Sequence, residues 1–205
     1  DLDENAIKPY LQLNSLRDAM FWSAGQLYGL RFERLKPGAV PVYHPDVTVF
    51  EVKNREGRHQ GLFYFDPWAR NGKQSGAWMN DYRPQERFDG ETATIVSNNL
   101  NFIEPPAGEA PLIGWDDART LFHEFGHAVH GLLSDVSYPS MSGTAVVRDY
   151  VELSSQIMEH WLSTPEVLDR FARHYETGAP CPEELIQKIR RAEKFNQGFA
   201  NAERL

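Results

Sequence analysis

LFHEFGHAVHGLL, residues 121–133, places two histidines four residues apart with a glutamate directly after the first. On an α-helix, His123 and His127 lie one turn apart on the same face, and Glu124 lies beside them. Two imidazoles can bind a zinc ion, and a neighbouring carboxylate can act as a general base, so peptide-bond hydrolysis is the first hypothesis. Because three fixed residues recur by chance in roughly a few per cent of chains of this length, the surrounding sequence has to support it.

The sequence around the motif predicts an amphipathic helix. Trp115-Asp116-Asp117 is typical of a helix start, where acidic residues complement the helix dipole. The apolar residues of the stretch share one stripe, and the histidines fall on the opposite side. That stripe consists of Leu121, Phe122, Phe125, Ala128, Val129, Leu132 and Leu133. We therefore expect the helix to bury one face in a core and to turn its histidines into a cleft.

Two further residues of the motif helix have different expected roles. Gly126 costs about 1 kcal/mol of helix propensity relative to alanine, and we expect it to permit the close approach of another segment. His130 shares the histidine face but lies about 10 Å along the axis from His123, which is too far for easy binding of the same ion. We expect His130 to support the site or the fold and not to be a ligand.

A catalytic zinc site has three protein ligands, so one more must come from elsewhere in the chain. The segment RDYVELSSQIMEHWLS, residues 148–163, is the best source. Glu152, 25 residues after His127, is the expected third ligand, and Glu159 is expected to orient a ligand histidine through its free ring nitrogen. A solvated helix face is the simpler alternative for both carboxylates. The residues expected to face the core are Tyr150, Leu153, Ile157 and Trp161.

These blocks together resemble the thimet oligopeptidase family of zinc peptidases, and most closely its bacterial peptidyl-dipeptidase branch. The matching blocks are FHEFGHAVHGLL, SGT and RDYVELSSQIMEHW, with KPYLQL, FWSAGQLYGLRFERL, VYHPDV and SGAWM upstream. The resemblance implies that His123, His127 and Glu152 bind one Zn²⁺ and that Glu124 is the general base. It also implies an oligopeptide substrate and the release of carboxy-terminal dipeptides, with internal cleavage as the alternative.

The resemblance also implies that part of the catalytic domain is missing. Family members carry a histidine and tyrosines farther along that hold the substrate, and no segment here matches them. The chain has no initiator methionine, and a helical pattern that starts at Pro182 runs to Leu205. We therefore expect a partial catalytic domain over residues 1–205. A zinc-binding fragment without turnover and a metal-free helical interaction domain are the alternatives.

Composition limits the possible partners. With 41% hydrophobic residues the 205-residue chain can bury a core as one domain, and its net charge of −8 argues against nucleic acid. Its single cysteine, Cys181, suits a reducing compartment, so we expect a cytoplasmic protein. No apolar run is long enough to cross a membrane, so no membrane partner is expected.

The coarse map predicts an α+β, mainly helical, zincin-like fold. Residues 1–36 are expected to form one long helix that ends at Pro37-Gly38. Residues 46–102 are expected to form a small antiparallel sheet beside the motif helix, with a hairpin loop at 54–60. Residues 115–205 are expected to be the helical zinc-binding part.

Two segments are candidates for substrate contact. SGAWM contains Gly76, Ala77 and Trp78, and it could pair with an extended peptide by strand addition, although a core strand that packs Trp78 is an equal alternative. The loop SMSGTAVVRD lies between the two ligand helices, and its Gly143 is a further candidate. For Tyr138 and Arg148, capping or a surface ion pair is the simpler expectation.

Overall fold

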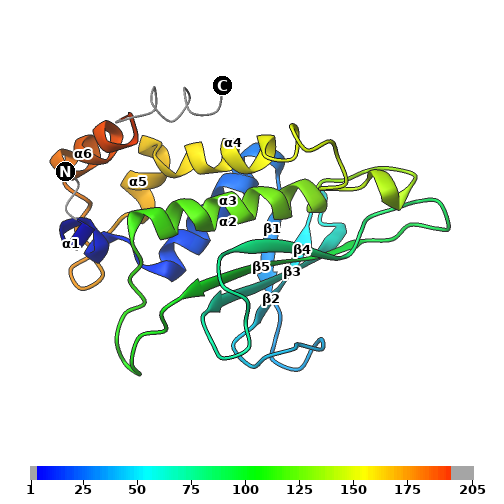
Figure 1. Ribbon diagram of the computed structural model, residues 1–205, viewed down its shortest axis with the longest axis horizontal. Coiled ribbons are helices and arrows are strands. Elements are labelled where there is room, and N and C mark those ends of the chain that lie inside the picture. Colours follow the sequence, from blue (N-terminus) through cyan, green and yellow to red (C-terminus); the bar gives the residue numbers. More distant parts are fainter. Residues whose placement is uncertain (1–3, 195–205) are drawn as a thin grey trace.

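The computed structural model describes residues 4–194, which form an α+β fold with a layer of helices over a sheet (Figure 1). The elements in chain order are α1 (Glu4–Ile7), η1 (Lys8–Tyr10), α2 (Leu13–Tyr28), β1 (Arg31–Arg34), β2 (Thr48–Lys53), β3 (His59–Trp68), β4 (Trp78–Arg83), β5 (Thr94–Phe102), α3 (Trp115–Leu132), η2 (Pro139–Met141), α4 (Leu153–Leu162), α5 (Pro165–Phe171) and α6 (Glu183–Lys194). The part of the expected last helix beyond residue 194 lies outside the described residues.

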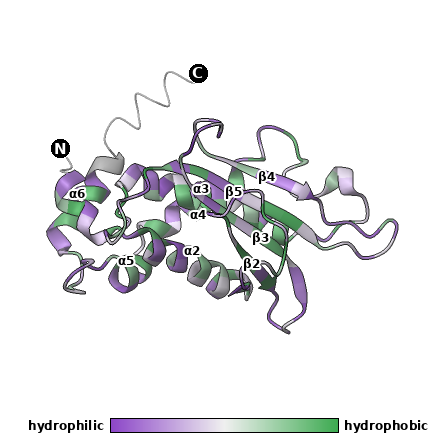
Figure 2. Ribbon diagram, turned by 90° about the horizontal axis from the view of Figure 1, so that it is seen from below, coloured by the Kyte–Doolittle hydropathy of each residue, from purple (hydrophilic) through white to green (hydrophobic). Residues whose placement is uncertain are grey.

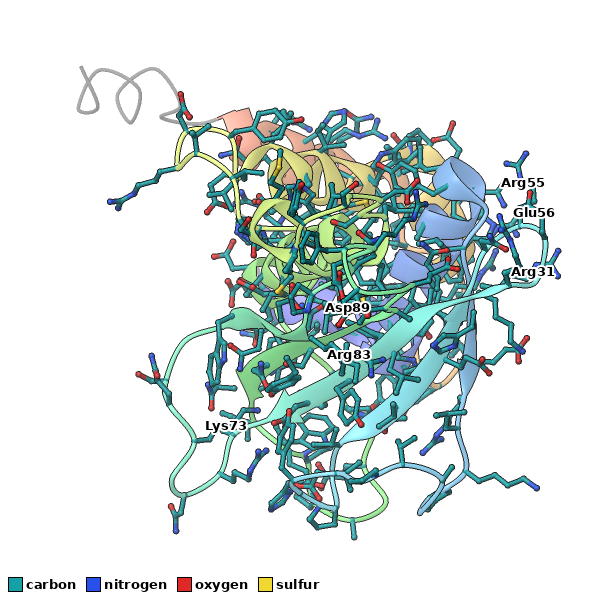
Figure 3. The ribbon with its side chains drawn as sticks, turned by 90° about the vertical axis from the view of Figure 1, so that its right-hand side faces the viewer. Arg31, Arg55, Glu56, Lys73, Arg83 and Asp89 are labelled. Carbon is teal, nitrogen blue, oxygen red and sulfur yellow. The ribbon has the colours of Figure 1, made fainter. Side chains whose placement is uncertain are left out.

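The sheet is mixed, so the prediction of an antiparallel sheet was wrong in one pairing. Its strand order is β1-β2-β3-β5-β4, and β3 pairs with β5 in parallel, with Phe63 opposite Val96. The chain leaves β3, forms β4 at the edge of the sheet, and returns through β5 between them. The β2–β3 hairpin was predicted correctly, and its loop carries Arg55 and Glu56 near Arg31 of β1 (Figure 3).

The prediction of one long helix over residues 1–36 was wrong, because the described part of this stretch is divided into α1, η1, α2 and β1, and α2 is shorter than the predicted helix. Helix α2 ends at Tyr28, because Gly29 adopts a left-handed conformation with φ of 73°. The N–H of Gly29 donates a hydrogen bond to the carbonyl of Gly25. The chain then forms β1, which pairs with β2. Phe32 of β1 stacks on Phe21 of α2 at 4.1 Å between ring centroids. Tertiary pairing therefore overrides the helical pattern of residues 31–35.

The core lies between the sheet and the helices. The predicted apolar stripe of α3 is buried through Leu132, whereas Leu133 follows the helix and is 37% exposed. Phe122 and Phe125 of α3 are fully buried, as is Phe63 of β3. Figure 2 shows this distribution, with β3 in hydrophobic green and the hairpin loops in hydrophilic purple. A smaller cluster around Val47, Val49 and Tyr64 lies apart from this core.

The predicted core face of α4 was wrong. Tyr150, Leu153 and Ile157 are 51%, 45% and 45% exposed, and Trp161 is half-buried. The buried residues of α4 are Ser155, Met158 and Leu162. A small residue faces α3 because the two helix backbones are too close there for a larger side chain, as described below.

An ion cluster holds the loop between β3 and β4. Asp66 is 1% exposed and accepts two hydrogen bonds from Arg70, at 2.6 and 2.8 Å. Lys73, labelled in Figure 3, donates to Asp66 Oδ1 at 3.0 Å and to the carbonyl of Trp68 at 2.8 Å. The loop that leads into β4 is therefore tied to the sheet before β4 begins.

No helix among residues 4–194 combines the length and the apolar character that a membrane span requires.

Candidate metal centre

The two motif histidines lie on consecutive turns of α3. The helix begins at Trp115, as predicted, and the Asp117 carboxylate accepts the N–H of Gly114 at 3.3 Å. The rings of His123 and His127 stand edge to face with their centroids 4.9 Å apart. The side chain of His123 is 27% exposed, whereas that of His127 is only 11% exposed.

Glu152 lies opposite both histidines. Its Oε2 atom is 3.1 Å from Nε2 of His123 and 3.3 Å from Nε2 of His127. Ligand atoms about 2.1 Å from a tetrahedral ion are separated by about 3.4 Å, so the spacing fits zinc. The donor set of two imidazoles and one carboxylate is also that of catalytic zinc sites. Of the described residues, these three form a group of potential ligands within 4.8 Å of one another.

The position of Glu152 depends on the packing of α4 against α3. A Cβ atom on Gly126 would lie 2.5 Å from Cα of Ser155, so the two backbones touch between the histidines and the first turn of α4. Ser155 also donates its hydroxyl to Glu152 Oε2 at 2.8 Å. The glycine of the motif thus brings the helices together, and Ser155 restrains the carboxylate.

His123 has a carboxylate partner on its other ring nitrogen. Its Nδ1 lies 2.6 Å from Oε1 of Glu159, and Arg119 donates to the second oxygen of Glu159 at 2.9 Å. The hydrogen bond that His123 donates to Glu159 raises the pKa of His123 above its ordinary value. Burial alone would raise the pKa of Glu159, but the hydrogen bonds from His123 and Arg119 outweigh it and lower that pKa. Glu159 is therefore ionised at neutral pH and makes the contact that its predicted role requires.

His127 has a different environment. Its Nδ1 is buried and has no hydrogen-bond partner among the described residues. Burial lowers the pKa of His127, whereas the nearby Glu152 opposes this effect. A neutral imidazole is the form that binds a metal ion. The two histidines thus differ: His123 has a carboxylate at each ring nitrogen, whereas His127 has one only at Nε2.

Glu124 lies beside the potential metal ligands His123, His127 and Glu152 but is not one of them. The residue is 7% exposed, and burial raises the pKa of its carboxyl. The nearby His123 and a hydrogen bond from the backbone N–H of Met79 oppose the increase, and Glu152 adds to it. A carboxyl with a raised pKa beside a metal site suits a group that accepts and returns a proton near neutral pH.

An open cavity of about 540 Å³ lies in front of this group. It is lined by Ala77, Asp116, Arg119, Thr120, His123, Glu124 and Glu159. Ala77 directly precedes β4, which forms one edge of the sheet. The cavity therefore runs from the start of β4 to the first turns of α3.

The other predicted site residues lie elsewhere. His130 is outside the metal-binding group, and its ring faces Tyr150 with centroids 6.4 Å apart. Gly143 is buried against the end of α3, where its N–H donates to Ser134 at 2.6 Å, so it packs and does not line the cavity. Gly76 has φ of 87°, and its carbonyl accepts a hydrogen bond from Asn101 at 2.7 Å.

Three residues that contact the site were not predicted from the sequence. Arg119 lies one turn before His123, and Ser155 lies three residues after Glu152, so helical spacing could have identified both. Asn98 of β5 donates to the backbone carbonyl of Glu124 at 2.7 Å. The signal for Asn98 was an amide between Val96 and Leu100 on one face of the strand.

Comparison with known proteins agrees with this geometry. The model of Peptidase family M3 matches residues 1–205. The chain belongs to peptidase family M3. Among the M3 relatives, dipeptidyl carboxypeptidase of Escherichia coli (strain K12) is 47% identical over all of this chain and 30% of its own length. Oligopeptidase A of the same organism is 38% identical over 95% of this chain and 29% of its own length. The chain thus spans about 30% of the length of these M3 relatives.

Proposed function

We propose that this chain supplies the metal-binding part of a zinc metallopeptidase that hydrolyses short peptides. The observation that carries the proposal is the convergence of His123, His127 and Glu152, with ligand atoms within 4.8 Å of one another and Glu124 beside them. In this proposal the fold is a zincin-like core, in which α3 carries the histidines and the start of α4 carries the glutamate.

The chain's own residues would have separate tasks. A bound zinc ion polarises the scissile carbonyl and lowers the pKa of a water molecule. Glu124 takes the proton from the attacking water and passes it to the leaving amine. Glu159 holds the ring of His123 through Nδ1, and Ser155 holds Glu152.

The free edge of β4 is the proposed place for the peptide backbone. Residues along a strand present their backbone groups alternately to its two edges, so Ala77 faces the same side as Met79, whose N–H reaches Glu124. The carbonyl of Gly76 is already engaged by Asn101. Of the three residues expected from the sequence to contact the substrate, Gly76 to Trp78, we therefore propose only Ala77 as the main-chain contact. A peptide-bound structure without a main-chain contact at Ala77 would rule it out.

Release of carboxy-terminal dipeptides is our first choice for the reaction. It rests on the 47% identity to an enzyme named dipeptidyl carboxypeptidase, against 38% to oligopeptidase A, whose name favours internal cleavage. The products decide between them: dipeptides alone support the first, and fragments of mixed length support the second. We propose the cytoplasm as the location, because the one cysteine fits a reducing compartment.

Two variants of the natural protein that carries this chain test the proposal. Glu124→Gln should retain stoichiometric zinc and lose peptidase activity, because the amide cannot accept the proton. Glu152→Ala should instead lose zinc. Full activity of Glu124→Gln would refute the base, and stoichiometric zinc in Glu152→Ala would move the third ligand to Glu159 or His130. Zinc binding without turnover in the natural protein would favour the zinc-binding module.

A further inference from the structure

Asn98 is a fully buried amide in the middle of β5. Its exposed fraction is 0%, and Nδ2 donates to the backbone carbonyl of Glu124 at 2.7 Å. Its neighbours two residues away on the same face of the strand, Val96 and Leu100, are also fully buried and apolar. A polar side chain therefore occupies a position where the strand pattern calls for an apolar one.

The hydrogen bond from Asn98 is not needed to satisfy α3. The carbonyl of Glu124 lies in the middle of the helix, where it already accepts the N–H four residues later. Oδ1 of Asn98 is buried and has no hydrogen-bond partner among the described residues. Burying an amide whose oxygen lacks a partner costs free energy. Asn98 is thus poorly explained as a residue that stabilises the core.

The cross-strand partner of Asn98 contacts the same glutamate. Met79 of β4 pairs with Asn98, and the Met79 N–H donates to the Glu124 carboxylate. Glu124 is therefore held at two points by one pair of neighbouring residues in the sheet. Asn98 fixes its backbone, and Met79 fixes its side chain. The two contacts together restrain both the rotation of α3 about its axis and its sliding along the sheet.

We propose that Asn98 is a positioning residue that sets the place of the general base relative to β4, along which the proposed substrate lies. The inference rests on the proposed role of Glu124. Without the Asn98 bond, α3 is free to shift over β5, and Met79 no longer meets the carboxylate at the same point. A displacement of about 1 Å in a catalytic group is enough to lower turnover by about a hundredfold.

Two variants of the natural zinc-loaded protein test this role. Asn98→Leu has the same branching with two methyl groups in place of the amide and no donor, and Asn98→Asp has the same shape with an oxygen in place of the donor. For both we expect a loss of kcat of at least about tenfold, with KM, zinc stoichiometry and zinc affinity within about twofold.

Asn99→Leu is the matched control. Asn99 is 3% exposed and adjacent in β5, but its hydrogen bonds go to Tyr43, Ser97 and Trp78 and not to α3. For Asn99→Leu we expect a lower melting temperature but, in contrast to the Asn98 variants, an unchanged kcat per bound zinc.

The outcomes separate this inference from the proposed function. If Glu124→Gln remains active, the proposed function fails. If Glu124→Gln is inactive but Asn98→Leu turns over at the wild-type rate, only the role of Asn98 fails. If both Asn98 variants lose zinc or do not fold, Asn98 is a structural residue and the inference is overturned.

Discussion

Gly126 and Ser155 bring the backbones of α3 and α4 into contact, since a Cβ atom on Gly126 would lie 2.5 Å from Cα of Ser155. No real Cβ atom is accommodated at that distance without a backbone shift. The contact lies between the helix that carries His123 and His127 and the helix that begins after Glu152. The distance between the histidines and Glu152 therefore depends on the absence of one methyl group.

Gly126→Ala is expected to weaken zinc binding. The added methyl group pushes α4 away from α3, so Glu152 moves away from the histidines, and we expect zinc affinity to fall by at least about tenfold. Competition with a fluorescent chelator measures this change. Gly25→Ala in α2 is the control, because its methyl group meets only the carbonyl of Leu30, at 3.2 Å, far from the histidines in sequence. Equal zinc affinity of the two variants would contradict the expectation.

Glu159→Gln is expected to weaken zinc binding through His123. The carboxylate raises the basicity of the ring and fixes its orientation, and the loss of such a partner lowers metal affinity by about 10- to 100-fold. Competition with the fluorescent chelator again measures the zinc affinity. Glu166→Gln on α5 is the control for the loss of an acidic residue. Wild-type affinity in Glu159→Gln would show that the carboxylate at Nδ1 is not needed to orient His123.

Asp66→Ala is expected to destabilise the fold without affecting the metal group directly. Removing one partner of a buried ion pair costs about 3–5 kcal/mol, because Lys73, whose side chain is 3% exposed, then keeps its charge with only backbone carbonyls as partners. Urea unfolding measures the loss. Lys53→Ala breaks the exposed ion pair with Glu33 and serves as the control, with no measurable change expected. A stability loss below about 1 kcal/mol in Asp66→Ala would contradict a stabilising role of the cluster.

The contribution of Asp66 is expected to disappear in acid. Burial raises the pKa of Asp66, but the hydrogen bonds from Arg70 and Lys73 outweigh it and hold the pKa below its ordinary value. The unfolded chain, with a pKa of about 3.9 at this residue, therefore takes up the proton first, so the stabilisation is complete above about pH 5 and falls at lower pH. The difference in melting temperature between wild type and Asp66→Ala should shrink from pH 6 to pH 3. A constant difference would contradict this assignment.

Much of the architecture followed from periodicity. The apolar stripe of α3, its start at Trp115 and the hairpin within the β region of residues 46–102 agree with the predicted patterns. Spacing also led to Glu152, since a carboxylate at the start of the next helix can return to the histidines. These features depend on local sequence, which is why the sequence alone was sufficient for them.

The failures concern interactions between distant segments. Residues 31–34 fit a helix, and only the pairing with β2 makes them a strand. The parallel pairing of β3 with β5 depends on which strand lies next to which, and strand patterns do not contain that information. In α4 the sequence offered an apolar face, yet the close approach at Gly126 selected the face with the small Ser155.

The amide of Met79 has a consequence for any strand added to β4. Because Glu124 already occupies that amide, the ladder of hydrogen bonds along the free edge is interrupted at Met79. A peptide that pairs with Ala77 cannot move along β4 to pair with Met79 instead, because the N–H of Met79 already donates to Glu124. Under the proposed function, Glu124 would therefore be an end stop for the added strand as well as the base, and one side chain would both fix the register of the peptide and accept the proton.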